Sequence, residues 1–151
     1  MDERALRELL EQVRAGETAI DEAIGALRRL PFDPIGYAHL DTHRALRAGF
    51  PEVVLCEGKR PEQAAAIIAR LAEGRGPVLG TRAGPELFAR VRELVPDARY
   101  HELARAIVVE REPLPRRPGK ILVACAGTAD LPVAEEAAVT AELMGNSVER
   151  L

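Results

Sequence analysis

The sequence has few aromatic residues, little lysine and no surplus of positive charge. There is no tryptophan, and the aromatic side chains are those of Phe32, Tyr37, Phe50, Phe88 and Tyr100. The core must therefore be built from Leu, Val, Ile and Ala. The 21 basic residues are outnumbered by 24 acidic ones, so the net charge is −3. This balance argues against a dedicated nucleic-acid binder, which needs a basic surplus for its phosphate contacts.

Long apolar runs and paired cysteines are also absent. No run of about 18 uncharged apolar residues occurs, so no membrane-spanning helix is predicted. The charged, amphipathic start MDERALRELLEQ differs from a secretory signal, which needs an apolar run. The two cysteines, Cys56 and Cys125, lie far apart, which is typical of reduced thiols in a cytosol. We therefore expect a cytoplasmic protein without a membrane partner.

The pattern of apolar residues predicts an α/β fold. Helical spacing predicts two helices before residue 31, followed by an irregular segment over residues 32–50. From residue 52 onward, the strand-like runs EVVLC, VLGTR, ARYHEL and AIVVE alternate with helices that begin at Pro61 and Pro85. This alternation favours a parallel sheet, in which ligands bind beyond the carboxyl ends of the strands.

A proline-rich stretch divides the chain. Segment 111–119 holds three prolines, which stiffen a chain, and it is interpreted as a linker. It separates an α/β domain over residues 1–110 from a strand (ILVACA) and a helix that ends near Gly145. One strand and one helix cannot bury a core alone. Either this piece adds to the sheet of the first domain, or residues 120–151 are the first βα unit of an incomplete domain, and we expect the second.

The turn between this last strand and helix is a candidate anion site. It reads Gly127-Thr128-Ala129-Asp130. Backbone N–H groups at a helix N-terminus attract anions, Thr128 adds a hydroxyl donor, and Asp130 can accept hydrogen bonds from ribose hydroxyls. The turn is neither a Walker loop nor a GxGxxG fingerprint. A simple capped turn, with Asp130 as the N-cap, explains the same residues.

Three basic residues are further candidates for contact with an anionic ligand. Lys59 and Arg82 follow predicted strands, and Arg44 lies in the irregular segment. Arginine can hold a carboxylate or phosphate through two parallel hydrogen bonds. The alternatives are solvated turns for Lys59 and Arg82, and a local ion pair with Asp41 for Arg44.

Histidine and cysteine give weaker signals. His39 and His43 would share a helical face but lack a third ligand there, so no metal site is predicted. Cys56 and Cys125 close apolar strand runs and are interpreted as small buried hydrophobic residues. Lys59, three residues after Cys56, is the one nearby cation that could lower the pKa of a thiol.

The segment ILVACAGTADLPVAEEAAVTAELMGNSVERL resembles the opening strand and helix of the PurE-like carboxylase fold. It is most similar to the LarB family, for which GT(S/A)DLPVAEEA followed by GN-VER is a specific signature. The earlier segments DTHRALRAGFPEVVLCEGKRPEQ and VLGTR resemble the N-terminal domain of the same family. The resemblance covers essentially the whole chain. It implies a helical N-terminus, a small βαβα-type domain and the start of a PurE-like parallel sheet.

The resemblance also implies an activity. LarB-type enzymes carboxylate the pyridinium ring of nicotinic acid adenine dinucleotide with CO2 or bicarbonate and hydrolyse its phosphoanhydride, in the biosynthesis of the nickel-pincer cofactor. A cysteine adds to the ring and makes the opposite position nucleophilic. No cofactor is firmly implied, with Mg²⁺ as a candidate, and the full-length protein is expected to be a homo-oligomer.

The chain departs from this family pattern in two respects. Ala129 stands where PurE proteins carry a serine beside the aspartate, so Asp130, Thr128, Gly127 and backbone amides would have to hold the nucleotide. The family's nucleophilic cysteine lies beyond VERL and is neither Cys56 nor Cys125. We therefore expect the 151-residue chain to be inactive alone. The alternative functions are a purine-pathway carboxylase acting on aminoimidazole ribonucleotide, and a non-catalytic nucleotide-binding or assembly module.

Overall fold

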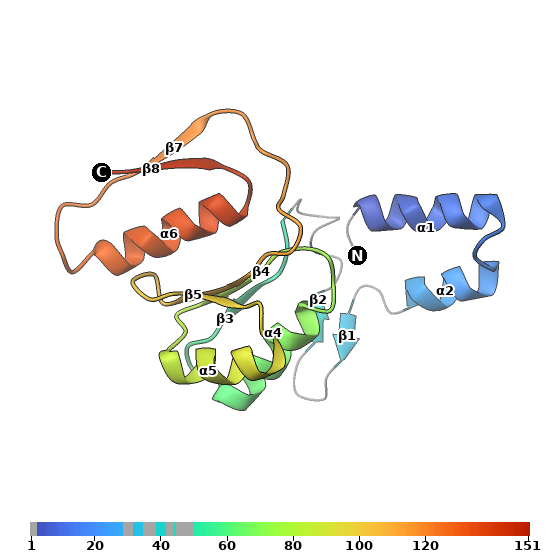
Figure 1. The fold of residues 1–151 in the computed structure, drawn as a ribbon, viewed down its shortest axis with the longest axis horizontal. Helices are drawn as coiled ribbons and strands as arrows, with labels where there is room; N and C mark the ends of the chain where they lie inside the picture. The colour runs from blue at the N-terminus through green and yellow to red at the C-terminus, as the bar shows by residue number, and fades with distance from the viewer. Residues whose placement is uncertain (1–2, 29–31, 35–38, 42–43, 45–49) are drawn as a thin grey trace. The chain divides into compact units, whose positions relative to one another are not determined.

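The protein is seen in a computed structural model that describes residues 3–28, 32–34, 39–41, 44 and 50–151. Its contacts divide the chain into two units, Met1–Glu52 and Val53–Leu151. Each unit is described by itself, and Figure 1 gives the labels of the helices and strands.

The first unit begins with the two predicted helices, α1 (Glu3–Ala15) and α2 (Ile20–Arg28). Gly16 ends α1 in a left-handed conformation with φ +75°, which glycine adopts without steric cost. No residue of α1 is buried. Two short strands, β1 (Phe32–Pro34) and β2 (His39–Asp41), then pair antiparallel within the segment that was predicted to be irregular.

The second unit contains the predicted alternation of strands and helices. Its elements in chain order are β3 (Val53–Leu55), α4 (Pro61–Leu71), β4 (Val78–Thr81), α5 (Pro85–Leu94), β5 (Arg99–His101), β6 (Ala106–Val109), β7 (Lys120–Val123), α6 (Leu131–Leu143) and β8 (Ser147–Arg150). Helices α4 and α5 each start at a proline. Proline has no N–H, and this costs nothing in the first helical turn, where an N–H has no acceptor within the helix. The α/β fold class is therefore confirmed.

The four-stranded sheet is mixed, which corrects the expectation of a parallel sheet. Its order is β3-β4-β6-β5. Strands β3 and β4 are parallel, as a βαβ unit requires, whereas β6 pairs antiparallel with both β4 and β5. The reason is local: β5 and β6 are joined by a four-residue connection, which is too short for a crossover helix and permits only a hairpin.

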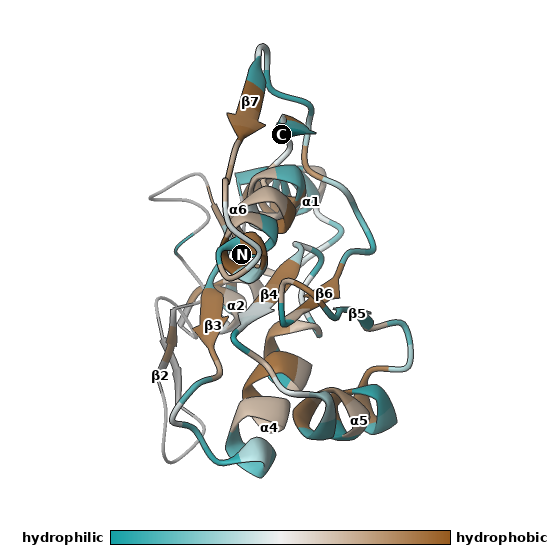
Figure 2. Cartoon of the chain, turned by 90° about the vertical axis from the view of Figure 1, so that its left-hand side faces the viewer, coloured by the Kyte–Doolittle hydropathy of each residue, from teal (hydrophilic) through white to brown (hydrophobic). Residues whose placement is uncertain are grey.

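Helices cover both faces of this sheet (Figure 1). On one face, Ile68 of α4 lies against Gly80, where an added Cβ would come within 2.9 Å of the Ile68 Cδ1 atom. On the same face, Phe88 of α5 stacks on Tyr100 with ring centroids 5.1 Å apart. Figure 2 shows β3, β4 and β6 as hydrophobic and the edge strand β5 as hydrophilic.

Helix α6 covers the other face. Val139 and Leu143 of α6 form one buried cluster with Leu79 of β4 and Val108 of β6. The helix leaves the β3 edge of the sheet less covered: Val53 and Leu55, in register with Leu79 and Thr81, are 37% and 47% exposed. The C-terminal segment therefore completes the core of the α/β domain.

The segment after the linker forms a βαβ unit, which corrects the expectation of a single strand and helix. Ser147–Arg150 forms β8, which pairs parallel with β7 over four residues. These two strands make a separate two-stranded sheet. Arg150 ties β8 to α6 through Glu135 and Glu142, with N–O distances of 2.6–3.0 Å.

Segment 111–119 is held at both ends. Arg111 forms a two-bond fork with Asp97 (2.7 and 3.1 Å) and donates to the carbonyl of Ala72 at the end of α4. Near its other end, the Arg117 N–H donates to the Gly145 carbonyl (2.9 Å). Gly145 has φ +85°, and an added Cβ would lie 2.5 Å from the Pro115 carbonyl oxygen.

We predict that Gly145→Ala destabilises the protein by about 2 kcal/mol or more, because it combines a strained backbone with a clash against a backbone atom. Gly119→Ala is the matched control: Gly119 has φ +94° but open space around its Cβ position. It should cost only the conformational strain, about 1 kcal/mol. Urea unfolding of both variants measures the difference, and equal costs would contradict the close contact with Pro115.

We also predict that Arg150 stabilises the protein at pH values above the unfolded pKa of Glu142. Its hydrogen bond is the largest cause of the lowered pKa of Glu142. A depressed folded pKa stabilises the protein above the unfolded value, near 4.5, and this contribution is lost as the pH falls through the folded pKa. Arg150→Gln should therefore flatten the loss of stability below about pH 4.5, by less than about 1 kcal/mol for this exposed group.

Lys120→Gln is the control for this second prediction, since it removes the cation of an exposed ion pair between β7 and β8, with Glu149 (3.0 Å). Unfolding midpoints measured from pH 3 to pH 7 give the comparison. If the stability of Arg150→Gln fell with pH as that of the wild type does, Arg150 would not control the protonation of Glu142.

Candidate functional site

Charged side chains gather where β3 and β4 end and β6 begins, at one end of the four-stranded sheet. We call Glu57, Lys59, Arg82 and Arg105 the strand-end cluster. Glu57 and Lys59 follow β3, Arg82 follows β4, and Arg105 precedes β6. The Ala83 N–H donates to the Arg105 carbonyl (2.7 Å), which brings the two arginine-bearing turns together. All four side chains are exposed.

Within the cluster, Glu57 and Arg82 form an ion pair of 2.8 Å. The Arg82 hydrogen bond, supported by the charges of Arg82 and Arg105, lowers the pKa of Glu57. The pKa of Arg82 is raised mainly by Glu57 and also by the charge of Glu136 on α6. The first half of α6 therefore lies near enough to this cluster to act on it electrostatically.

Arg82 and Arg105 have left-handed backbones, with φ of +51° and +49°. In the part of the chain that the structure describes, the other residues with positive φ are glycines. A side chain in this region costs of order 1 kcal/mol and is enriched at functional sites. The presence of arginine at both positions is therefore a reason to look for a ligand here.

Lys59 uses part of its donor capacity within the turn. Its Nζ atom donates to the Leu55 carbonyl at 2.8 Å, and its backbone N–H donates to the Cys56 carbonyl at 3.1 Å. An ammonium group has three donors. Lys59 can therefore anchor the turn and still meet an anion with its remaining N–H groups.

Cys56, next to the cluster, is not an activated nucleophile. The thiol is buried, and burial raises its pKa to about 11, an effect that the nearby charge of Lys59 only partly offsets. Its Sγ atom lies 3.1 Å from the position that a Cβ on Gly80 would take. Cys56 thus fills the core, in agreement with its interpretation as a small hydrophobic residue.

The turn at residues 127–130 leaves its polar groups available. Asp130 occupies the N-cap position of α6, but its side chain makes no capping hydrogen bond. Its backbone N–H donates to the Gly127 carbonyl (3.0 Å), which closes the turn. Thr128 and Asp130 are exposed. The carboxylate of Asp130 is therefore not used as a helix cap, although the capped turn explained the sequence equally well.

Arg44 lies in the first unit and is not placed relative to these groups. Its Nε atom is 4.0 Å from a carboxylate oxygen of Glu52. The side chain of Asp41, its alternative partner from the sequence, lies outside the described residues, as does His43. Among the sequence candidates, the structure brings Arg82 and Lys59 to one end of the sheet.

Arg105 was missed in the sequence. It lies between two strand-like runs in a connection without glycine, so nothing marked a tight turn there. Its left-handed conformation and its place beside Arg82 follow from the antiparallel return of β6. The basic residue between ARYHEL and AIVVE was the available signal, but it becomes informative only once the strand order is known.

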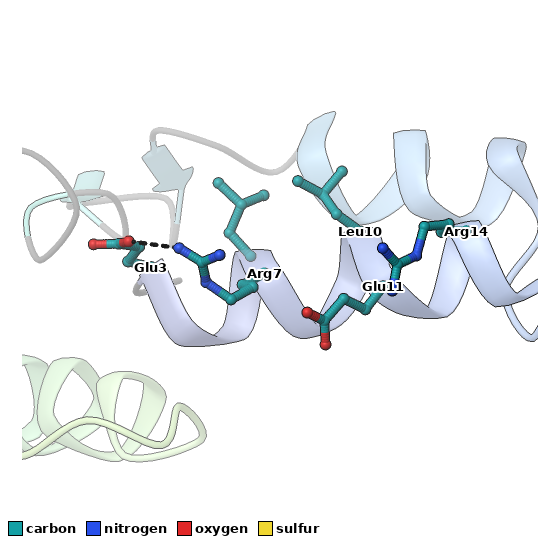
Figure 3. Close-up of a pocket in the computed structure, with 6 residues that line it drawn as sticks. Glu3, Arg7, Leu10, Glu11 and Arg14 are labelled. Atoms are coloured by element: carbon teal, nitrogen blue, oxygen red, sulfur yellow. Dashed lines mark hydrogen bonds and ion pairs between the residues drawn. The ribbon is translucent and has the colours of Figure 1, made fainter.

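A surface hollow lies along α1. Its described lining residues all belong to that helix, and Figure 3 shows Glu3, Arg7, Leu10, Glu11 and Arg14 along it. The ion pair between Arg7 and Glu3 (3.2 Å) joins successive turns of the helix. This hollow lies along a single helix, and we assign it no function.

Among the described residues, no helix is long and apolar enough to cross a membrane. Within the same residues, no group of three His, Cys, Asp or Glu side chains is placed to hold a metal ion.

We predict that Arg105→Gly gives a more stable protein than Arg105→Ala by about 1 kcal/mol, since both remove the side chain but only glycine accepts φ +49° without strain. Thermal or urea unfolding measures the difference. The same pair at Arg99, in a regular strand, is the control and should show the opposite order. Equal stability of the two Arg105 variants would remove the evidence for strain.

Comparison with known proteins identifies the family. A family model described as the LarB/PurE-like N-terminal domain matches residues 32–112. The uncharacterized protein MJ0165 of Methanocaldococcus jannaschii is 30% identical over 147 residues, which cover 93% of this chain and 57% of that protein. The chain thus spans little more than half of this relative's length. It belongs to the LarB/PurE-like N-terminal domain family.

Proposed function

We propose that this chain is the N-terminal part of a LarB-type enzyme that carboxylates the pyridinium ring of nicotinic acid adenine dinucleotide and hydrolyses its phosphoanhydride. Its family membership supports this assignment. In this proposal the chain binds and orients the dinucleotide, and the covalent chemistry belongs to residues outside it.

The single observation that carries the proposal is the state of Asp130. It lies at the start of a 13-residue helix, yet its carboxylate does not cap that helix. An uncommitted carboxylate can accept hydrogen bonds from both hydroxyls of a ribose. The N–H groups of Leu131 and Val133 in the first turn of the helix, where Pro132 has none, are donors for an adjacent phosphate, together with the Thr128 hydroxyl.

The strand-end cluster supplies the complementary charge. Arg82 and Arg105 are permanently cationic and can hold a carboxylate or phosphate group. In this structure, Arg82 forms an ion pair with Glu57. We infer that an anionic group of the substrate replaces Glu57 as the partner of Arg82, and that Lys59 adds a third positive charge.

The chemistry of ring activation is not assigned to either cysteine of this chain. Cys56 is buried with a pKa of about 11, so it is a neutral thiol at pH 7. We assign Mg²⁺ to no residue of this chain. CO2 or bicarbonate remains the proposed co-substrate of the complete enzyme.

The test is to titrate the 151-residue chain with nicotinic acid adenine dinucleotide, AMP and aminoimidazole ribonucleotide. Calorimetry measures the three affinities. We expect the dinucleotide to bind most tightly, because it alone offers two ribose-phosphate halves and a carboxylate. Asp130→Ala should weaken its binding about tenfold, through loss of hydrogen bonds to a charged acceptor.

Asp130→Asn is the matched control, since it keeps one acceptor oxygen and should weaken binding less. Unchanged dinucleotide affinity in Asp130→Ala would refute the role of this carboxylate. Tighter binding of aminoimidazole ribonucleotide than of the dinucleotide would favour a purine-pathway carboxylase instead.

A further inference from the structure

A second cavity lies at the opposite edge of the sheet from β3, where α6 stops short of covering β5. Its volume is about 420 Å³. It is bounded by β5 and β6, by residues 113–116 of the linker, by the last turn of α6 and by the start of β8. We call it the sheet-edge pocket. Figure 1 shows the linker passing the C-terminal end of α6.

The floor of the sheet-edge pocket is apolar. Val108 of β6 and Val139 and Leu143 of α6 line it, and each is at most 4% exposed. These residues belong to the cluster that joins α6 to the sheet. A ligand in this pocket would therefore rest on the surface of a packed core.

The carboxylates of the sheet-edge pocket already have partners. Glu110 pairs with Arg99 across β5 and β6 (2.8 Å). Both oxygens of Glu142 accept hydrogen bonds from Arg150 (2.6 and 3.0 Å). The pocket therefore offers little negative charge for a cationic ligand.

The uncommitted side chains of the pocket are hydrogen-bond donors. Within the described chain, His101, Arg116 and Ser147 make no side-chain hydrogen bond or ion pair. His101 and Arg116 both help to lower the pKa of Glu142, after the larger effect of Arg150, so both side chains lie near this carboxylate. They lie on different segments, β5 and the linker, and line the same pocket.

The linker wall of this pocket is held in place. The Arg117 N–H donates to the Gly145 carbonyl (2.9 Å), and Gly145 packs against Pro115 and Leu114. Arg116 is therefore presented by a fixed stretch of backbone. Preformed pockets of 300–1,000 Å³ with apolar walls and a few polar groups are typical ligand sites.

We propose that the sheet-edge pocket binds a small organic anion, whose carboxylate or phosphate group contacts Arg116 and His101 and whose apolar body rests on Val108, Val139 and Leu143. This site is separate from the strand-end cluster and from the turn at residues 127–130. Its occupation would add contacts between the sheet, the linker and the βαβ unit, and so stabilise their packing.

The test uses the 151-residue chain with four probes: benzoate, phenyl phosphate, the neutral isostere benzamide, and inorganic phosphate. We expect benzoate or phenyl phosphate to bind, and the stronger of the two identifies the preferred anionic group. Benzamide lacks the charge and inorganic phosphate lacks the apolar body, so each should bind at least tenfold more weakly. Calorimetry gives the affinities, and backbone NMR shifts at β5, β6 and residues 113–116 locate the site.

Arg116→Gln and Arg117→Gln form a matched pair of variants. They change the net charge equally and are adjacent, but only Arg116 lines the sheet-edge pocket. Arg116→Gln should weaken binding of the organic anion about tenfold or more, since it removes a charged hydrogen bond, whereas Arg117→Gln should change it less than twofold. His101→Gln should weaken binding without altering the unfolding midpoint of the free protein.

Three results would overturn the proposal. These are the absence of binding by both organic anions, equal binding of benzamide or inorganic phosphate, and equal effects of the two arginine variants. None of them bears on dinucleotide binding through Asp130, so the two assignments fail or stand separately.

Discussion

The packing of α6 against the four-stranded sheet is the contact on which the second unit depends. Leu79, Val108, Val139 and Leu143 are nearly inaccessible to solvent, and burial of each such side chain contributes roughly 1.5–3 kcal/mol. Without α6, one face of the sheet would lie open to water. The same packing sets the turn at residues 127–130 at the start of the helix and the sheet-edge pocket beside its last turn.

Arginine has two distinct roles around this core. Arg111 and Arg150 are committed to forks that attach the linker and β8 to neighbouring elements. Arg105 and Arg116 have no such commitment within the described residues, and each lies at a proposed binding surface. The sequence alone does not separate these two groups of arginines. Only the hydrogen-bond partners of each guanidinium show whether an arginine is structural or available to a ligand.

The main helices and the strands β3, β4, β5, β6 and β7 could be predicted from the sequence, because strand-like runs and the prolines at 61 and 85 mark them directly. Strand β8 could not, since SVER holds one apolar residue and its pairing with β7 depends on backbone hydrogen bonds. The antiparallel direction of β6 was also missed, because the turn before it contains no glycine to mark it. Lys59 and Arg82 could be placed at strand ends, but their neighbour Arg105 depends on strand order.

The order of strands in the sheet has a consequence for folding on the ribosome. Strand β6 pairs with both β4 and β5, yet it is the last of the four to be synthesised. Until residues 106–109 emerge, β4 lacks the neighbour that covers its second edge, and an open strand edge is a template for other chains. Helix α6 emerges later still, so the apolar face that it covers is the last to be hidden. Exposed apolar surface and unpaired strand edges of this kind make partly folded chains prone to aggregate.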